Sequence, residues 1–129
     1  MEIRNYESSD YSMLCKWWEH WGWSPLGEAT LSKTGLIVTN QGIDVASCFI
    51  YKTDSCVCWI EHYLINKQAS KHARRGAIEF LIDASVEKAK QMGFAVSMSS
   101  VNHKGLIEKL IQSGYSHGDS NMSNLVRGL

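Results

Sequence analysis

The chain has 129 residues, of which 44% are hydrophobic and 20% are charged, and its formal net charge is zero. This length is typical of one domain, and the composition is that of a globular protein rather than a disordered chain. A neutral chain has no overall field that would draw it to nucleic acid or to an anionic membrane. We therefore expect a single domain over residues 1–129, without a nucleic-acid or membrane partner, in which any anion is bound by a local cluster of cations.

Neither the N-terminal residues nor the cysteines suggest an exported protein. Glu2 and Arg4 precede only a short apolar stretch, and no segment approaches the roughly 18 apolar residues of a membrane helix. The four cysteines form no CxxC pair and no metal-binding spacing with histidine. We interpret them as small buried residues in a reducing compartment, and we expect a cytoplasmic protein without a bound metal.

The first third of the chain predicts a strand, a helix and a loop. Glu2–Tyr6 has the composition of a short strand, and the oxygens of residues 8–10 would cap a helix that ends near Trp21. One face of this helix carries an apolar stripe at the spacing i, i+3, i+4, i+7, made of Tyr11, Leu14, Cys15 and Trp18. A second stripe to one side is made of Met13, Trp17 and Trp21. We expect Trp18 in the core, and Trp17 and Trp21 partly open to solvent.

Three strands joined by tight turns follow a loop over residues 24–34. They are predicted at Gly35–Thr39, Val45–Tyr51 and Cys56–Ile65, with turn residues at positions 40–42 and 53–55. Such short connections favour an antiparallel meander.

The second half of the chain predicts a long helix over Ser70–Met92, a strand over Phe94–Ser99 and a last helix that begins at Asn102 and ends at Gly114. A strand that follows a crossover helix lies parallel to the strand before it. The tail, Tyr115–Val126, alternates weakly and is predicted to form one or two closing strands. The fold class is therefore α+β, with a mixed sheet in the order β-α-(α)-β-β-β-α-β-α-β and helices on both faces.

The start of the predicted long helix is unusually basic. Lys71, Arg74 and Arg75 crowd its first two turns together with a histidine, and the first acidic residue is Glu79. Cations are disfavoured at a helix N-terminus by about 0.3–1 kcal/mol each, and Gly76 costs about 1 kcal/mol more inside a helix than alanine does. A phosphate bound there would offset both effects. The alternative is a solvated basic face in which Arg75 pairs with Glu79.

Taken together, these features resemble the GNAT superfamily of acyl-CoA N-acyltransferases. The resemblance rests on the strand Trp59–Ile65, the basic segment Lys71–Gly76 and the ending from Asn102 to Tyr115, and it covers nearly the whole chain. The segments Lys33–Val38 and Asn121–Leu125 are similar to small bacteriophage and bacterial members. The resemblance implies an N-acyltransferase that moves an acyl group, typically acetyl, from acyl-CoA to a primary amine of a small molecule or a protein.

The resemblance also implies where acetyl-CoA binds. The strand would contact the thioester carbonyl, and the basic segment would hold the pyrophosphate in place of the family's R/Q-x-x-G-x-G/A loop, of which Gly76 is retained while Arg74 or Lys71 replaces a glycine. Asn102 matches the asparagine at the start of the family's last helix. The candidate acetyl-CoA-binding residues are Tyr63, Leu64, Ile65, Lys71, His72, Arg74, Arg75, Gly76, Ala77 and Asn102.

Transfer to an amine needs a base, and Glu61 and His62 are the two candidates. Neighbours on a regular strand point to opposite faces, so we expect only one of them to look into the cleft; the family position favours Glu61, whereas an intrinsic pKa near neutrality favours His62. The family's usual acid, a tyrosine seven residues after the asparagine, is replaced by Lys109. Tyr63, Tyr115 and Ser99 are further candidates for the acid.

The tryptophans Trp17, Trp21 and Trp23 are the candidate acceptor-binding residues, because the first helix and the loop after it shape the acceptor site in this family. Large aromatic side chains also serve as core or as the contact patch of a homodimer, and the sequence leaves these readings open. Two functional alternatives also remain: a catalytically silent relative that binds acyl-CoA or a protein partner, and a nucleic-acid-binding module, which the neutral charge disfavours.

Overall fold

A computed structural model describes all residues, Met1–Leu129. The strands are β1 Glu2–Asn5, β2 Gly35–Asn40, β3 Ile43–Tyr51, β4 Val57–Ile65 and β5 Val96–Met98. The helices are α1 Tyr11–His20, α2 Lys71–Arg74, α3 Ala77–Gln91 and α4 Lys104–Gln112, with short 3₁₀ turns at Ser8–Asp10 and Glu28–Thr30. No helix in the structure has both the length and the apolar character that crossing a bilayer requires.

The five strands form one sheet in sequence order, β1-β2-β3-β4-β5. The pairs from β1 to β4 are antiparallel, and β5 lies parallel to β4 after the crossover through α2 and α3. The predicted meander and the predicted parallel β-α-β unit are both confirmed. β5 is short, because only Val57, Cys58 and Trp59 of β4 pair with it.

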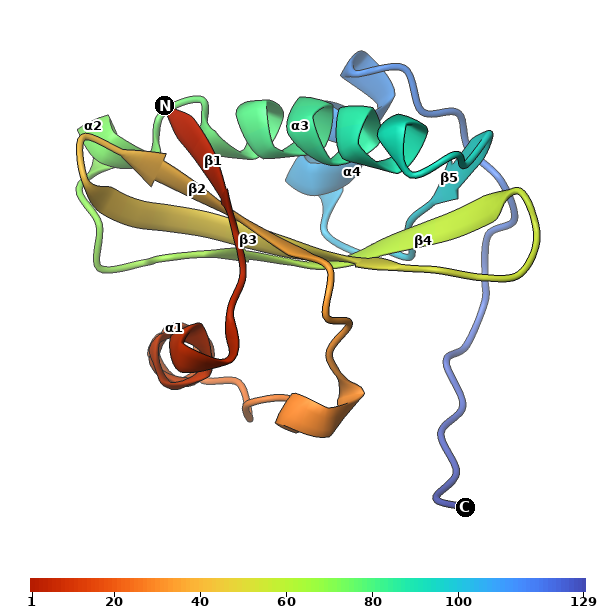
Figure 1. The fold of residues 1–129 in the computed structure, drawn as a ribbon, viewed down its shortest axis with the longest axis horizontal. Helices are drawn as coiled ribbons and strands as arrows, with labels where there is room; N and C mark the ends of the chain where they lie inside the picture. Colours follow the sequence, from red (N-terminus) through yellow and green to blue (C-terminus); the bar gives the residue numbers. More distant parts are fainter.

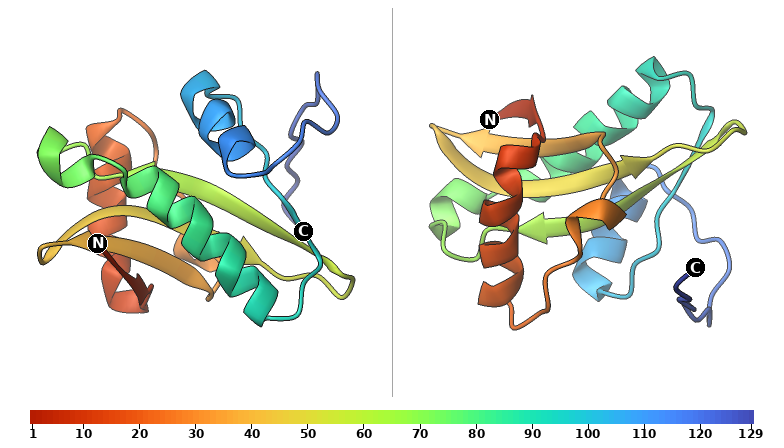
Figure 2. Two further views of the ribbon diagram at one scale, coloured as in Figure 1. Left: turned by 90° about the horizontal axis from the view of Figure 1, so that it is seen from above. Right: turned by 60° about the horizontal axis from the view of Figure 1, so that its bottom comes forward.

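Helices cover both faces of the sheet, as predicted. In Figure 1 the sheet is seen nearly edge-on, with α2, α3 and α4 above it and α1 below it. The larger core lies on the α3 side and includes Leu36, Ile50, Ile60, Leu81 and Ile82, all nearly or fully inaccessible to solvent. Figure 2 shows that α1 and α3 cross the sheet on its opposite sides.

The smaller core lies under α1 and corrects one prediction about the tryptophans. It consists of Leu14, Trp17, Trp18, Phe49 and Leu64. Trp18 is buried as expected, but Trp17 is buried too, with only 3% of its surface exposed. The helix packs flat on the sheet along the ridge that Leu14, Trp17 and Trp18 share, whereas Cys15 of the predicted stripe lies at its margin.

The long helix predicted over Ser70–Met92 is interrupted. Ser70 caps the single turn of α2 by accepting a hydrogen bond from the backbone N–H of Ala73. Arg75 is then extended, and Gly76 adopts a left-handed conformation with φ of 76° before α3 starts. Glycine adopts this conformation without the steric cost that a side chain adds. The cations therefore do not lie inside the first turns of α3 but directly before it.

The C-terminal part differs from the prediction in two further ways. His103, not Asn102, is the N-cap of α4, because its Nδ1 accepts a hydrogen bond from the backbone N–H of Leu106. Residues 116–129 form no closing strand; all of them are exposed. Two of the four cysteines, Cys48 and Cys58, are fully buried as predicted, whereas Cys56 lies exposed in the turn before β4.

Candidate functional site

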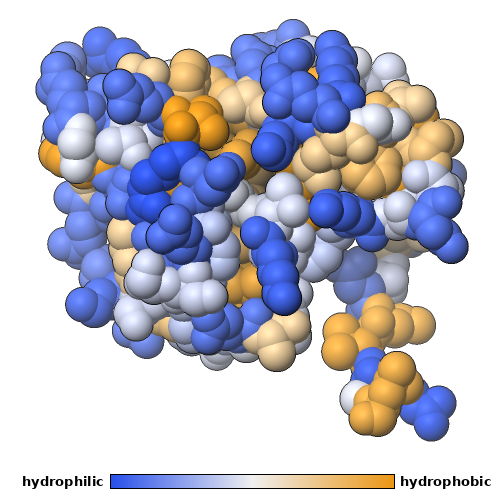
Figure 3. Space-filling view, viewed as in Figure 1, coloured by the Kyte–Doolittle hydropathy of each residue, from blue (hydrophilic) through white to orange (hydrophobic).

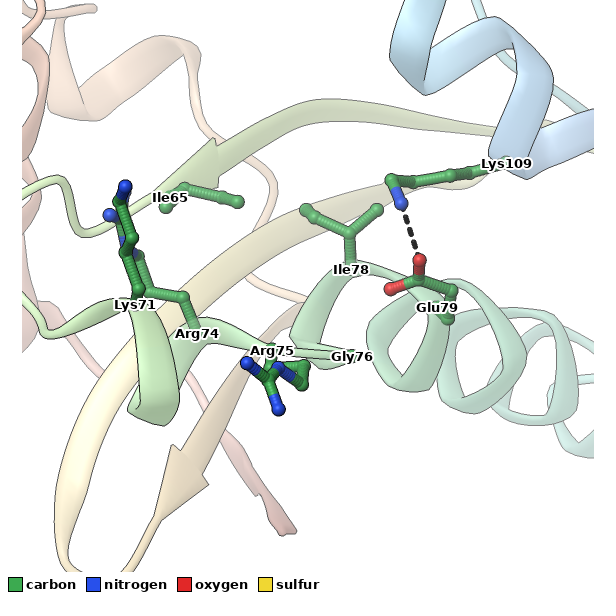
Figure 4. A pocket seen from close by; sticks show the side chains of 8 residues that line it. All are labelled: Ile65, Lys71, Arg74, Arg75, Gly76, Ile78, Glu79 and Lys109. Carbon is green, nitrogen blue, oxygen red and sulfur yellow. Dashed lines mark hydrogen bonds and ion pairs between the residues drawn. The ribbon is translucent and has the colours of Figure 1, made fainter.

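A basic cavity of about 500 Å³ opens where the end of β4 meets the α2–α3 junction and the middle of α4. Figure 4 shows its lining residues, which come from all four elements: Ile65, Lys71, Arg74, Arg75, Gly76, Ile78, Glu79 and Lys109. Four of these carry a positive charge and only Glu79 carries a negative one, so the cavity suits an anionic ligand although the chain as a whole is neutral.

The backbone adds hydrogen-bond donors to this charge. The first hydrogen bond inside α3 runs from the N–H of Phe80 to the carbonyl of Gly76 at 3.0 Å. The N–H groups of Ala77, Ile78 and Glu79 therefore have no acceptor within the helix, and the positive end of the helix dipole points in the same direction. A helix N-terminus of this kind binds phosphate groups in many proteins.

The arginines next to the helix start are not neutralised by the protein. No carboxylate lies within ion-pair distance of Lys71, Arg74 or Arg75, and the expected pairing of Arg75 with Glu79 is absent. Nε of Arg74 is buried without a hydrogen-bond partner. A buried donor without a partner costs free energy, so a ligand that accepts this N–H would stabilise the site.

Glu79 pairs instead with Lys109, which reaches across from α4, as the dashed line in Figure 4 shows. The hydrogen bond from Lys109 lowers the pKa of Glu79 below its usual value. This ion pair joins α3 to α4 at the rim of the cavity. From the sequence, Lys109 was identified only as the residue that replaces the family's tyrosine. Its pairing with Glu79 was not predicted, because the two residues lie 30 positions apart.

Beyond the cavity, β4 and β5 diverge, and polar side chains bridge the gap between them. The Ser99 hydroxyl donates to the carbonyl oxygen of Ile60 at 2.7 Å and lies 3.2 Å from the hydroxyl of Tyr63. The hydroxyls of Ser97 and Tyr115 are 2.7 Å apart. Burial raises the pKa of Tyr63 far above its usual value, so its phenol stays protonated at neutral pH. The strand edge of β4 after Trp59 has no strand partner on this side.

A β-bulge in the middle of β4 changes how the two candidate bases are presented. The pairing with β3 shifts between Ser47 and Phe49, and His62 takes a positive φ of 59°. As a result Ile60 and Tyr63, three positions apart, both contact the α3-side core. The simple alternation that would send Glu61 and His62 to opposite faces is therefore broken.

Both candidate bases lie close to Tyr51, on the sheet face that α1 covers. The His62 ring meets the Tyr51 ring edge-on, with centroids 5.7 Å apart. Burial raises the pKa of Tyr51, and the nearby charge of Glu61 raises it to a smaller extent. Glu61 accepts a 2.8 Å hydrogen bond from the N–H of Ser100. Burial raises the pKa of Glu61 and lowers that of His62. Both shifts favour the neutral form, but they act differently near pH 7: the pKa of Glu61 moves towards neutrality, which suits a general base, whereas that of His62 moves further below it.

The exposed tryptophans Trp21 and Trp23 lie near the C-terminal end of β4, the end that also lines the basic cavity. The Trp21 and Trp23 rings stack with centroids 5.5 Å apart, and Nζ of Lys67 lies 4.8 Å from the Trp21 ring centre. The indole N–H of Trp21 donates a 2.9 Å hydrogen bond to the carbonyl of Ile65, a residue that also lines the basic cavity. Trp21 and Trp23 are 36% and 54% exposed. They are available to a ligand, whereas the buried Trp17 is not.

The structure thus brings most of the predicted residues to one end of the sheet and leaves a few aside. Ile65, Lys71, Arg74, Arg75 and Gly76 line one cavity. Ala77 is buried beneath it, and Leu64 belongs to the core under α1. His72 and Asn102 are exposed and line none of it. No group of three or more His, Cys, Asp or Glu side chains is arranged to hold a metal ion.

No protein-family model matches the sequence, and no curated protein matches it. Solved structures are similar over almost the whole chain. A ribosomal-protein-alanine N-acetyltransferase from Brucella melitensis superposes with a TM-score of 0.70 at 12% identity, covering 99% of this chain and 100% of that one. An acetyltransferase from Trypanosoma brucei gives 0.66 at 18% identity, covering 96% and 99%.

A third similar structure contains a ligand. It is an aminoglycoside N-acetyltransferase in complex with CoA, with a TM-score of 0.61 at 13% identity and coverage of 99% of both chains. At such low identities the likeness concerns the fold alone. The chain has the mixed five-stranded sheet and the helix arrangement of GNAT-type acetyltransferases.

Proposed function

We propose that this protein is an N-acyltransferase that moves an acetyl group from acetyl-CoA to a primary amine. The observation that carries the proposal is the basic cavity at the start of α3, where three unpaired cations, a buried Arg74 Nε without a partner and free helix amides converge. A pyrophosphate carries enough charge and oxygen atoms to pair with the cations and to accept hydrogen bonds from the Arg74 Nε–H and from the helix amides. The GNAT fold supports the same assignment, because its similar structures include acetyltransferases and one complex with CoA.

In this proposal the residues around the cavity hold the donor. Arg74, Arg75 and Lys71 bind phosphate oxygens, and the amides of Ala77 and Ile78 donate to them. Between Glu61 and Leu64, β4 has no strand partner on its β5 side and offers backbone groups to the rest of the acetyl-CoA molecule. Bound acetyl-CoA supplies the acyl group as a thioester. His72 and Asn102 take no part in this arrangement.

In this proposal, proton transfer depends mainly on side chains of β4. A protonated amine is not a nucleophile, so a base must first accept its proton, and Glu61 is our choice because its pKa is raised and a hydrogen bond from Ser100 fixes its orientation. His62 is the alternative base. The hydroxyl of Tyr63, whose pKa burial raises, remains protonated at neutral pH and is a candidate donor to a leaving thiolate. The hydroxyl of Tyr115, which is hydrogen-bonded to Ser97, is a second candidate.

The acceptor is proposed to bind against Trp21 and Trp23. Their stacked rings are exposed, and the hydrogen bond from Trp21 to Ile65 attaches them to the strand that also lines the donor cavity. A flat or cationic group on the acceptor would find an aromatic surface there.

Calorimetric titration with acetyl-CoA tests donor binding. We expect binding by the wild type and a loss of about tenfold or more in affinity for Arg74→Glu or Arg75→Glu, because each change places a negative charge beside the phosphates. Lys33→Glu, an equal charge change at an exposed loop position, is the matched control and should bind as the wild type does. The absence of any binding by the folded wild type would refute the proposal.

A second function is favoured by one observation. Lys109 stands where many GNAT members have their acidic tyrosine, and its amino group is engaged by Glu79. This favours a catalytically silent relative that binds acyl-CoA or a protein partner. Mass spectrometry of a panel of primary amines incubated with acetyl-CoA separates the two: acetylated product supports the enzyme, and tight binding without product on any amine supports the silent relative.

A further inference from the structure

A lysine lies beside the two exposed tryptophans and gives their surface a positive charge. Nζ of Lys67 is 4.8 Å from the centre of the Trp21 ring, and the Trp23 ring stacks on Trp21 with centroids 5.5 Å apart. All three residues are exposed. We call Trp21, Trp23 and Lys67 the aromatic shelf. The shelf offers a ligand a flat ring and a cation side by side.

The charge of Lys67 is not neutralised by the protein. None of the ion pairs in the structure includes Lys67, and Glu19, the acidic residue closest in sequence to Trp21, does not pair with it. An aromatic face attracts cations, but on Trp21 a cation is already present. Lys67 would repel a second cation and attract an anion. The shelf therefore favours an aromatic ligand with a negative charge over one with a positive charge.

The aromatic shelf adjoins the basic cavity through Ile65. The carbonyl of Ile65 accepts the 2.9 Å hydrogen bond from the Trp21 indole, and Ile65 also lines the cavity. In the proposed function the phosphates of the donor bind the cations of the cavity. Lys67 does not line the cavity, so its charge stays available to the acceptor.

The surface around the shelf offers little to an aliphatic ligand. In Figure 3 the lower part of the body, where Figure 1 places α1 and the loop after it, is coloured mainly as hydrophilic or intermediate. Neither residues 19–25, which carry both tryptophans, nor residues 66–68 contain Leu, Ile, Val or Met. An aromatic ring can stack on Trp23, whereas a long alkyl chain would find no apolar groove there.

The spacing along β4 sets the length of the acceptor. Glu61, our choice of base, precedes Ile65 by four residues of the strand. Four residues of a strand span roughly 13 Å. A molecule whose amine reaches Glu61 while its other end lies on the shelf is therefore elongated.

We propose that the acceptor is an elongated amine whose far end is an aromatic ring with a negative charge, and that this end binds on the aromatic shelf. The ring stacks on Trp23, the more exposed of the two tryptophans, and Lys67 attracts the anionic group. The role of this molecule as an acceptor rests on the proposed function, whereas its binding to the shelf is measured without the donor.

Four small probes separate the effect of the ring from that of the charge. Each is titrated into the isotope-labelled full chain while the indole N–H signals of Trp21 and Trp23 are followed by NMR. We expect naphthylacetate to bind about tenfold more tightly than naphthylethylamine, because the two differ in the sign of a charge near Lys67. The uncharged naphthylacetamide should lie between them. Cyclohexylacetate, which has the charge but no aromatic ring, should bind at least about threefold more weakly than naphthylacetate.

Variants of the shelf identify the groups involved. Lys67→Glu should reverse the order of the two charged probes, and Trp23→Ala should weaken naphthylacetate about threefold to tenfold. Lys90→Glu, the same charge change at an exposed position in the last turn of α3, is the matched control and should keep the wild-type order. Saturating CoA should not displace naphthylacetate, because the probe lies outside the basic cavity.

Any of four results would overturn binding to the shelf. These are no shift of either indole signal with any probe, tighter binding of naphthylethylamine by the wild type, an order that Lys67→Glu leaves unchanged, and displacement of naphthylacetate by CoA. None of them bears on donor binding, which the acetyl-CoA titration measures separately. A chain that fails to bind acetyl-CoA would refute the acetyltransferase and leave the shelf as a site for aromatic anions.

Turnover with acetyl-CoA tests the role as an acceptor. The substrate is naphthylacetate with an aminoalkyl chain long enough to reach Glu61, and its partner is the same aminoalkyl naphthalene without the carboxylate. We expect a KM about tenfold lower for the first, and this advantage should be lost in Lys67→Glu but kept in Lys90→Glu. Equal KM values for the two amines in the wild type would overturn the assignment of the acceptor.

Discussion

The backbone N–H of Ser100 donates a 2.8 Å hydrogen bond to Oε1 of Glu61, and this bond ties the loop after β5 to the middle of β4. The two strands have already stopped pairing at this point, so the contact holds their diverging ends together. It also fixes the carboxylate beside the bulge at His62. A carboxylate that is half-buried, with a raised pKa, accepts a proton more readily than an exposed one does.

We therefore expect Glu61→Gln to lower the rate of acetyl transfer by about 10²–10⁴-fold, the usual contribution of a general base. The amide side chain of this variant would keep an acceptor for the N–H of Ser100 but could not take up a proton. His62→Asn should have a much smaller effect. The measurement is kcat for acetylation of a primary amine at several pH values. A fully active Glu61→Gln variant beside an inactive His62→Asn variant would reverse our assignment.

The same residue predicts a pH dependence of stability. Because burial raises the pKa of Glu61 in the folded state, the folded protein favours the protonated carboxyl. This contribution to stability is complete below the unfolded-state pKa of about 4.3 and is lost as the pH rises through the folded-state pKa. Glu61→Gln should thus gain stability relative to the wild type as the pH rises from about 4 towards neutrality. Urea unfolding across that range measures the difference, and a difference that shrinks with pH would contradict it.

The burial of the tryptophans leads to a third prediction. Trp17 and Trp18 are 3% and 5% exposed, so replacing either with alanine should cost about 3–5 kcal/mol of unfolding free energy. Trp21→Ala should cost less, because the ring is 36% exposed and lies outside the core under α1; the hydrogen bond to Ile65 that it loses is worth about 0.5–1.5 kcal/mol. Chemical denaturation measures all three. Equal losses for Trp18→Ala and Trp21→Ala would mean that Trp21 is core and would remove it from the acceptor site.

Local patterns in the sequence were sufficient to predict the sheet and its connections. Alternating apolar residues between short turns predicted the meander β2–β4, and the crossover helix predicted a parallel β5, because both patterns depend on neighbours in the sequence. The burial of Trp17 was not predicted. The stripe through Leu14 and Trp18 is a property of the helix, whereas the side that rests on the sheet is decided by Phe49 and Leu64, which come from other elements.

Three other features depended on long-range or backbone effects. The bulge at His62 arises from the pairing of β4 with β3, and the alternation of a single strand does not reveal it. Gly76 was interpreted as a costly residue inside a helix, but it ends one helical turn and starts the next. The tail was predicted to form closing strands from a weak alternation of residues, but residues 116–129 form none, because alternation alone does not supply a neighbouring strand to pair with.

The backbone at Gly76 provides a fourth prediction. Its φ is 76°, and an added Cβ would meet only Met1 Cε at 3.7 Å, so the obstacle to a side chain is conformational rather than steric crowding. Gly76→Ala should cost about 1–2 kcal/mol of unfolding free energy and shift Arg75, which weakens acetyl-CoA binding. Gly27→Ala is the matched control, because Gly27 has φ of −63° and an added Cβ would meet only Thr30 Cγ2 at 3.9 Å. If Gly76→Ala and Gly27→Ala lowered the melting temperature equally, the left-handed conformation would not be the reason for a glycine at position 76.

The ion pair between Glu79 and Lys109 gives the last prediction. Glu79 is the only acidic residue that lines the basic cavity, and its carboxylate occupies the Lys109 amino group that would otherwise face a bound anion. Glu79→Gln should therefore tighten acetyl-CoA binding several-fold, and Lys109→Met should weaken it. Both changes should diminish at high ionic strength, because the groups are largely exposed and salt screens them. Asp83→Asn removes the same charge one turn further along α3, outside the cavity, and serves as the control.

The effect of the pair on stability should be small and should have the opposite pH dependence to that of Glu61. Lys109 lowers the pKa of Glu79, so the stabilisation is present above the unfolded-state pKa and is lost as the pH falls through the folded-state value. An exposed pair contributes only about 0–1 kcal/mol, so Glu79→Gln should change the free energy of unfolding little at neutral pH. Tighter acetyl-CoA binding at nearly unchanged stability is thus the expected result. Weaker binding by Glu79→Gln would instead mean that the carboxylate positions Lys109 for the ligand and does not compete with it.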